Sequence, residues 1–418
     1  MDSSIAVNPL GISLVKRLRK SEYRNRLKAL GLVAPLLAFI FVTFLFPIVQ
    51  LLFTSVDNTV VPRTIPVTVG LLSQWDPHSQ RLPDAEVYKA FATELASGTN
   101  LEISKMAAHL NYFESGARSL VVRTARAVDK SVYQESAEAV RDRLIDIDGK
   151  WGEPQPWALI RNYSGEHTAG FYLTSLDLRY AADGSIEAQT PEASLYRNVF
   201  GRTFMISALV TALCLLLGYP VAYLLASIPA RIGNLLMILV LLPFWTAILV
   251  RTTAWVVLLQ SEGVINDALL ALGIFDEPHQ LIFNRFGVIV AMTHILLPYA
   301  ILSLYSVMKG VSPVYVRAAR SLGAGPVKSF FAVYLPQTMP GVSAAGMLVF
   351  ILALGYYITP AMVGGGEDQM VSYFVAEHVN TTLNWGLASA LGMLLLVSVV
   401  VLYGIYTRLV GGNGLKLG

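Results

Sequence analysis

The residues of this sequence with the most chemical potential lie inside apolar segments. Arg251 lies in Leu249-Val-Arg-Thr-Thr-Ala-Trp255, and Gly355-Tyr-Tyr-Ile-Thr-Pro360 sets two aromatic rings and a hydroxyl beside a helix-breaking proline. A guanidinium inside a bilayer costs at least ~2.5 kcal/mol, so it usually faces a protein interior, a water-filled cavity or the headgroups. Such side chains could bind and pass a polar solute.

Two interpretations of these residues stay open. Arg251 is a pathway or gate residue, or it snorkels to the headgroups or pairs with a neighbouring helix. The aromatic pair beside Pro360 lines a cavity, or it belongs to an interfacial belt. For any single proline in these segments a simple packing kink is favoured. The candidate pathway residues are Trp245, Arg251, Tyr356, Tyr357 and Thr359.

Sequence patterns typical of enzymes are missing. The stretch Gly323-Ala-Gly-Pro-Val-Lys-Ser329 resembles a phosphate-binding loop, but it has Val327 where a glycine must precede the lysine. Neither a His-Glu-x-x-His pattern, a Cys/His metal pattern nor a Gly-x-Ser-x-Gly nucleophile elbow occurs. His294 and Cys214 are interpreted as packed residues. We therefore expect no catalytic residue, no metal site and no cofactor in this chain.

Composition places the chain in a membrane. Of 418 residues, 54% are hydrophobic and only 14% are charged, whereas soluble proteins are about 25% charged. The net charge of +3, without basic runs interleaved with aromatics, argues against a nucleic-acid partner. Six segments approach the ~20 apolar residues that a spanning helix needs. They are about Leu30–Phe53, Thr203–Ser227, Leu235–Leu259, Gly287–Val307, Gly341–Met362 and Gly386–Tyr406.

Basic residues near the ends of these segments predict their orientation. The N-terminal segment holds seven lysines and arginines between Lys16 and Lys28, and its apolar run exceeds the ~7–15 residues of a secretory signal. We interpret this run as an uncleaved first span. The alternating loops then predict a multi-pass membrane protein with both termini cytoplasmic. The basic loop residues are Arg231, Lys309, Arg317, Arg320, Lys328 and Arg408.

The segment 54–197 differs in kind, because it is polar, carries both charge signs and is long enough for a small domain. Its patterns predict helices over Asp84–Ala96 and Glu135–Ile147, a strand over Phe171–Tyr180 and a turn at Asp183-Gly184. We expect a mixed α/β extracytoplasmic domain here. The predicted organisation is a basic cytoplasmic segment 1–29, a span 30–53, the inserted domain 54–197, a membrane domain 198–409 and a tail 410–418.

The most informative stretch is the predicted cytoplasmic loop about 310–340. It indicates a short helix, a turn at Gly323 and a second short helix that ends at Pro336. An apolar face at helical spacing would dock into a groove on another protein, or would lie on the membrane surface. Spacing alone does not separate the two. The face consists of Tyr315, Ala318, Ala319 and Leu322.

This loop resembles the coupling loop of ATP-binding-cassette (ABC) importer permeases, the EAA motif. Ala318, Ala319, Gly323, Leu335 and Pro336 match the pattern, and Arg317 stands where the family usually has glutamate. That departure leaves open which polar contact this chain makes with its ATPase. The resemblance implies that a set of loop residues transmits force to the ATPase. The set is Arg317, Ala318, Ala319, Leu322, Gly323, Leu335 and Pro336.

Further segments look like the spermidine/putrescine branch of these permeases. They are Leu242–Trp255, Glu262–Asn266, Ala353–Pro360 and Gly364-Gly365, within about Leu195–Leu409. The resemblance implies an all-α polytopic protein, with six transmembrane helices in a type I ABC importer permease bundle and the α/β domain inserted between helices 1 and 2. It also implies two permease subunits, identical or different, two ATPase subunits that hold ATP and Mg²⁺, and an extracytoplasmic solute-binding protein.

The sequence indicates the identity of the transported solute less directly. Many polyamine permeases have an acidic residue near the position where this chain has the pair Tyr356 and Tyr357. This chain therefore departs from those permeases at a position that bears on the choice of solute. Aromatic faces also hold ammonium groups by cation–π attraction, so a polyamine is favoured, and an opine, amino-acid or sugar-acid solute stays open. An ion-coupled carrier would need intramembrane carboxylates, and none falls clearly within the predicted spans. A sensor would need an output domain, and the tail after Arg408 is short.

Overall fold

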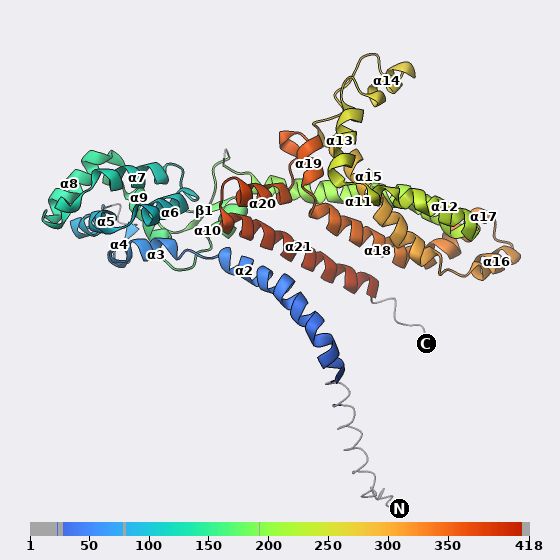
Figure 1. Ribbon diagram of the computed structural model, residues 1–418, viewed down its shortest axis with the longest axis horizontal. Helices are drawn as coiled ribbons and strands as arrows, with labels where there is room; N and C mark the ends of the chain where they lie inside the picture. The colour runs from blue at the N-terminus through green and yellow to red at the C-terminus, as the bar shows by residue number, and fades with distance from the viewer. Residues whose placement is uncertain (1–22, 24–27, 78–80, 192, 412–418) are drawn as a thin grey trace, which may run out of the picture. The chain divides into compact units, whose positions relative to one another are not determined.

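The computed structural model describes residues 23, 28–77, 81–191 and 193–411 (Figure 1). The predicted basic segment 1–29 and the tail 410–418 lie almost entirely outside these residues. The chain divides into two units, Met1–Thr54 and Ser55–Gly418. The described residues include six helices long and apolar enough to cross a membrane, which confirms the predicted number. They are Lys28–Thr54, Tyr196–Ser227, Ile248–Ala271, Arg285–Met308, Pro326–Leu354 and Trp385–Arg408.

The helix of the first unit is apolar all around. It contains a π-helical turn, η1 (Phe41–Leu45), followed by α2 (Phe46–Thr54). None of its most apolar window is buried, and Phe39 and Phe53 are 61% and 64% exposed. A helix with no polar face is typical of a membrane span.

Three long helices form the centre of the second unit. These are α11 (Tyr196–Ser227), α15 (Arg285–Met308) and α18 (Leu335–Leu354), and each packs against the other two. Small residues allow close approach: a Cβ atom on Gly341 of α18 would lie 2.8 Å from the Cβ of Val307. Cys214 of α11 is fully buried. Contacts of this kind hold helices together in lipid, where burial of apolar surface provides little driving force.

Three apolar clusters follow one another along α11, whose 32 residues span ~48 Å at 1.5 Å per residue. Tyr196 and Val199 at its start pack with Phe171 of the inserted region. Ala222 and Leu225 near its end pack at the other end of the bundle, with α15 and the segment that follows it. The inserted region and the predicted coupling segment therefore lie at opposite ends of α11.

The predicted third span, about Leu235–Leu259 with an interruption at Pro243, is divided into separate helices. The chain forms α12 (Ala230–Leu241), a 3₁₀ turn η5 (Leu242–Trp245) and α13 (Ile248–Leu259), followed by α14 (Val264–Ala271). Thr246 and Ala247 are extended, with ψ of 139° and 144°. Pro243 removes one backbone donor and crowds the preceding turn, so the helix stops there.

The predicted fifth span and the predicted helix end at Pro336 also differ from the structure. After α16 (Pro313–Ser321), the elements α17 (Pro326–Ser329), η6 (Phe330–Tyr334) and α18 are continuous, and Pro336 lies in the first turn of α18. Pro336 has no backbone N–H to donate to the preceding turn. The π-helical geometry of η6 accommodates this loss. The chain then breaks at Gly355–Tyr357 and continues as α19 (Ile358–Val363), η7 (Gly366–Asp368), α20 (Val371–Asn380) and α21 (Trp385–Gly411).

The region between the first two spans is mainly helical. The predicted helices are confirmed as α5 (Ala85–Ser97) and α8 (Ala137–Ile147). The other elements are α3 (Val60–Thr64), α4 (Pro66–Leu72), α6 (Asn100–Asn111), α7 (Ala117–Ala127), η3 (Lys130–Tyr133), η4 (Gly149–Gly152), α9 (Pro154–Asn162), α10 (Gly170–Ser175), β1 (Leu178–Tyr180) and β2 (Ile186–Ala188).

The predicted strand Phe171–Tyr180 is therefore wrong over its first half. Gly170–Ser175 forms the helix α10, whereas only Leu178–Tyr180 pairs, antiparallel, with Ile186–Ala188. Short apolar runs do not distinguish a strand from a helix by periodicity alone. The predicted turn at Asp183-Gly184 is confirmed, because Gly184 has a φ of +84° and the Ser185 amide donates to Asp183 Oδ1 at 2.8 Å.

Two fully buried tryptophans form the centre of this region's own core. The rings of Trp151 and Trp157 lie 4.9 Å apart, with Phe91 and Tyr88 against them. Trp151 Nε1 donates to Thr124 Oγ1 at 2.8 Å, and the Tyr88 hydroxyl donates to the Trp151 carbonyl at 2.8 Å. The indole of Trp157 also donates to the Trp151 carbonyl, at 3.2 Å. Both buried indole N–H groups thus have a hydrogen-bond partner, which stabilises a dense core.

His109 connects this core to the beginning of the region. Its Nε2 lies 2.6 Å from Asn58 Oδ1, while Asn58 Nδ2 donates to the carbonyls of Tyr163 and Gly165. Since the Asn58 oxygen can only accept, Nε2 carries the proton of a neutral ring. Burial is the main cause that lowers the pKa of His109 to about 4.

This pKa predicts a stability that depends on pH. An unfolded histidine binds a proton below pH 6.5, but the folded ring does so only near pH 4. The stabilisation is therefore complete above pH 6.5 and is lost as the pH falls toward 4, by on the order of 3 kcal/mol. Protease resistance of residues 55–195, measured between these pH values, should fall accordingly. A His109→Gln variant should show a flatter profile; an equally steep one would contradict the assignment.

Candidate functional site

The helix α16 is bounded by strong local signals at both ends. Ser312 caps its start by accepting the Val314 amide at 3.4 Å, and Pro313 occupies the first helical position. At its end, the amides of Gly323 and Ala324 donate to the carbonyls of Arg320 and Ala319, both at 3.0 Å. This pair of bonds is the Schellman motif.

Gly323 is required by this motif for its backbone conformation. Its φ is +90°, and no atom lies within 4 Å of the position that a Cβ would take. Space is therefore available for a side chain, but the left-handed conformation disfavours every residue with a Cβ, and β-branched residues most. The glycine of the predicted coupling motif thus sets the angle at which the chain leaves α16.

One face of α16 has no partner within the described chain. Tyr315 is 57% exposed and Leu322 is 89% exposed, and Ala318 and Arg317 are also exposed. On the opposite side, Val316 packs against the end of the bundle. Of the predicted coupling residues, the structure groups those from Arg317 to Gly323 on α16, with Ala319 half-buried, but places Leu335 and Pro336 beyond η6, at the start of α18.

Aromatic side chains that the sequence motifs did not indicate pack beside α16 and α17. Tyr223 of α11 contacts Phe330 and Tyr334 edge-to-face, with ring centres 5.6 and 5.1 Å apart. The Tyr219 hydroxyl bonds Thr338 Oγ1 at 2.8 Å. These contacts connect η6, which follows α17, to α11, and α11 to α18. The aromatic residues at Phe330, Phe331 and Tyr334 were the available signal.

A second group of polar side chains lies where α13, α15 and α19 meet. Arg251 is half-buried, and its Nε and Nη1 are buried without a hydrogen-bond partner among the described residues. It interacts electrostatically with His294 and Tyr356. Thr359 is fully buried, with its hydroxyl 3.2 Å from that of Thr252. The structure thus places Arg251, Tyr356 and Thr359, three of the candidate pathway residues, near one another.

Trp255 and His294 belong to this group and were missed. The indole of Trp255 donates to His294 Nδ1 at 3.1 Å. Trp255 falls on the same face as Arg251 because the two are four residues apart on α13, a spacing that could have indicated it. Trp245 and Tyr357, the other two candidate pathway residues, are 77% and 41% exposed.

Comparison with known proteins identifies the family. Residues 215–412 match the family model of the binding-protein-dependent transport system inner membrane component. The spermidine/putrescine transport system permease protein PotB of Haemophilus influenzae is 35% identical over 214 residues, which cover 51% of this chain and 75% of the relative. The chain belongs to this family. It is thus an ABC importer permease, a multi-pass inner-membrane transport subunit and not an enzyme.

Two further comparisons gave weaker matches. The molybdenum transport system permease protein ModB of Mycobacterium bovis is 30% identical over 204 residues, 48% of this chain and 75% of the relative. A solved bacterial alginate ABC transporter, in complex with an alginate-bound periplasmic protein, has a chain that matches 51% of this permease and 77% of itself, at 14% identity and a TM-score of 0.43. The inserted region 55–195 lies outside the family match.

The geometry of α16 predicts the effect of changing its last turn. Gly323→Val should force a β-branched residue into the left-handed conformation, at a cost of ~2 kcal/mol, and should unwind the end of α16. Uptake should fall at least ~10-fold, while membrane insertion is unchanged. Insertion and uptake are measured on the same membranes.

Gly323→Asn is the matched control, since asparagine tolerates this conformation best after glycine. It should retain most of the uptake. Normal uptake by Gly323→Val would contradict the importance of this turn.

Proposed function

We propose that this permease forms the translocation pathway together with a second permease subunit, and that α16 docks into separate ATPase subunits, which hold ATP and Mg²⁺. The observation that supports this proposal most directly is the exposed face of Tyr315, Ala318 and Leu322 on a helix that is capped at both ends. An apolar helical face of this size suits a groove on a partner. Arg317 would then meet an acidic or carbonyl group of the ATPase, since a guanidinium only donates.

The distribution of charge supports the orientation that this proposal needs. Lys309, Arg320 and Lys328 lie at the α16 end of the bundle, and Glu367 and Glu377 lie in the connections at the end of the inserted region. Basic residues favour the cytoplasmic side. The α16 end and both chain termini would then be cytoplasmic, and the inserted region extracytoplasmic, where a solute-binding protein delivers its cargo.

The same contacts suggest how ATP drives transport. Closure of the ATPase pair would displace α16 and α17, and the aromatic contacts of Phe330 and Tyr334 with Tyr223 would carry the displacement to α11 and α18. The breaks at Thr246–Ala247 and Gly355–Tyr357 adjoin the Arg251 group. Discontinuous helices are a common feature of transport sites, and these breaks would open and close the pathway.

The solute is a small polar molecule, and a polyamine such as spermidine or putrescine is the first candidate. This proposal rests on the similarity to the Haemophilus influenzae permease that bears this name. Tyr356, together with Trp255 near Arg251, offers aromatic faces that attract ammonium groups. Similarity to a permease named for molybdenum shows that the family as a whole does not set the solute.

One observation favours a second candidate, an opine, amino-acid or sugar-acid solute. Nε and Nη1 of the Arg251 guanidinium have no hydrogen-bond partner among the described residues, and the carboxylate of such a solute could accept from this charged group. A purely cationic solute leaves these donors unsatisfied, whereas an acidic group would satisfy them.

Arg251→Gln separates the two candidates. For an acid-bearing solute, loss of a charge-assisted pair should raise the KM of uptake ~10-fold or more. For a polyamine, uptake should be unchanged or faster, because a repelling charge is gone. Arg251→Lys keeps the positive charge but loses the planar set of guanidinium donors, and it should give an intermediate KM. Uptake of labelled spermidine, octopine and an amino acid into membrane vesicles provides the measurement.

Co-purification tests the importer assignment itself. The tagged permease, extracted from its own membranes in gentle detergent, should carry a stoichiometric ATPase identified by mass spectrometry. Leu322→Asp places a charge on the docking face and should remove the ATPase. Leu272→Asp changes another exposed leucine, 72% exposed and directly after α14, and should not. A chain that purifies alone, with uptake that follows an ion gradient, would indicate a secondary carrier instead.

A further inference from the structure

The helix α7 of the inserted region presents an unusual single-sign charge. It carries Arg118, Arg123 and Arg126 and no acidic residue, whereas α5, α6 and α8 carry both signs. All three arginines are exposed. Arg123 pairs with Asp148 at 2.8 Å, but Arg118 and Arg126 form no ion pair with any residue that the structure describes.

The opposite face of α7 fixes this helix in place. Leu120, Val121 and Thr124 are buried in the core around Trp151. Before the helix, Asn111 Oδ1 accepts the amides of Gly116 and Arg118 at 3.0 and 3.3 Å. The arginines therefore extend from a rigid support, which lowers the entropy lost when a partner binds.

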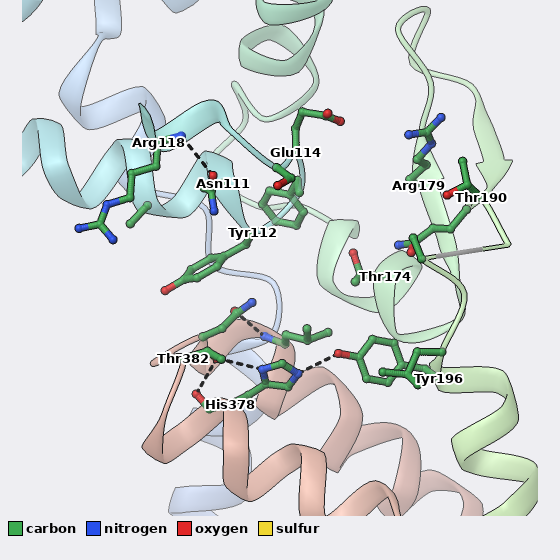
Figure 2. Close-up of a pocket in the computed structure, with 18 residues that line it drawn as sticks. Asn111, Tyr112, Glu114, Arg118, Thr174, Arg179, Thr190, Tyr196, His378 and Thr382 are labelled. Atoms are coloured by element: carbon green, nitrogen blue, oxygen red, sulfur yellow. Dashed lines mark hydrogen bonds between the residues drawn. The ribbon is translucent and has the colours of Figure 1, made fainter. Parts of the chain in front are cut away.

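Two hollows adjoin α7. One of about 450 Å³ lies along its outer face and includes Val122, Arg123 and Arg126. The other, of about 770 Å³, includes Arg118 and lies between the inserted region and the start of α21. Figure 2 shows Arg118 and Arg179 on opposite sides of the larger hollow, with Tyr112 and His378 between them.

The wall of the larger hollow comes from two sources. His378, Thr382 and Asn384 belong to the part of the chain that matches the permease family, whereas Tyr112 and Arg118 belong to the inserted region outside it. The His378 ring is held between the Tyr196 hydroxyl at 2.8 Å and Thr382 Oγ1 at 2.9 Å. A molecule seated here would contact the inserted region and the permease bundle together.

We propose that α7 and these two hollows form the surface on which the solute-binding protein of this system docks, through acidic side chains. The inference rests on the proposed importer function and orientation. Concave surfaces accept protruding loops of a folded partner, and unpaired arginines attract its carboxylates and speed its approach. The family requires a binding protein, and this surface joins the inserted region to the mouth of the bundle.

The test uses the complete complex in phosphatidylcholine nanodiscs. Solute-binding proteins of the same organism are added one at a time, and the one that stimulates ATP hydrolysis by the wild-type complex becomes the probe. Arg118→Glu with Arg126→Glu should raise the probe concentration for half-maximal stimulation at least ~10-fold. The salt dependence of this concentration should weaken as well. Stimulation is expressed relative to each variant's own rate without the probe.

Matched controls separate charge from folding. Arg63→Glu with Lys105→Glu changes two exposed basic residues elsewhere on the inserted region and should leave the response at the wild-type value. Arg118→Lys with Arg126→Lys keeps the charge and should retain most of the response. A response that the double glutamate variant retains in full would overturn the docking surface.

Two other outcomes have distinct meanings. If the glutamate variant differs from the wild type only when phosphatidylglycerol is present, the arginines bind anionic lipid and the docking proposal is wrong. If no binding protein stimulates the wild-type complex, the importer function is overturned, and the docking proposal with it.

Discussion

The constraint behind this fold is that hydrocarbon offers no hydrogen bonds, so every backbone amide and carbonyl in the membrane needs a partner within the protein. Long helices meet this need by themselves. Where the chain breaks at Gly355–Tyr357, the Ser372 hydroxyl donates to the freed Leu354 carbonyl at 2.9 Å. At the other break, Thr246 Oγ1 donates to the Pro243 carbonyl at 2.9 Å. Each break is thus held by a specific side chain.

These breaks explain which parts of the fold the sequence could predict. Apolar length alone indicated six helices, and the helical spacing of an apolar face with a glycine after it indicated α16 and the turn at Gly323. The exact course of the chain around Pro243 and Pro336 could not be predicted. A proline in an apolar run ends a helix when extended residues follow, as at Thr246, but is tolerated next to a π-helical turn, as at Pro336. The neighbouring helices decide between these outcomes, and one sequence does not show them.

The candidate site was likewise only partly predictable from the sequence. Local patterns identified Arg251, Tyr356 and Thr359, because polar residues are conspicuous in apolar segments. His294 lies on α15, and only the packing of α13 against α15 places it beside Trp255. The aromatic support beneath α16 likewise joins residues more than 100 positions apart, such as Tyr223 and Phe330. Long-range pairs of this kind depend on helix register, which composition and periodicity do not specify.

The inserted region is packed against the start of α11 and the start of α21. A Cβ atom on Gly386, at the start of α21, would overlap the Phe171 ring of α10, so the two elements are in direct contact. Asp177 adds to this joint by accepting the amides of Leu195, Tyr196 and Arg197 at 2.8 to 2.9 Å, which satisfies the first turn of α11. A load on the inserted region therefore acts on α11 and α21 through close-packed groups. The same helix, α11, meets the aromatic support of α16 at its far end. One helix, α11, thus extends from the surface outside the family match to the segment that resembles a coupling loop.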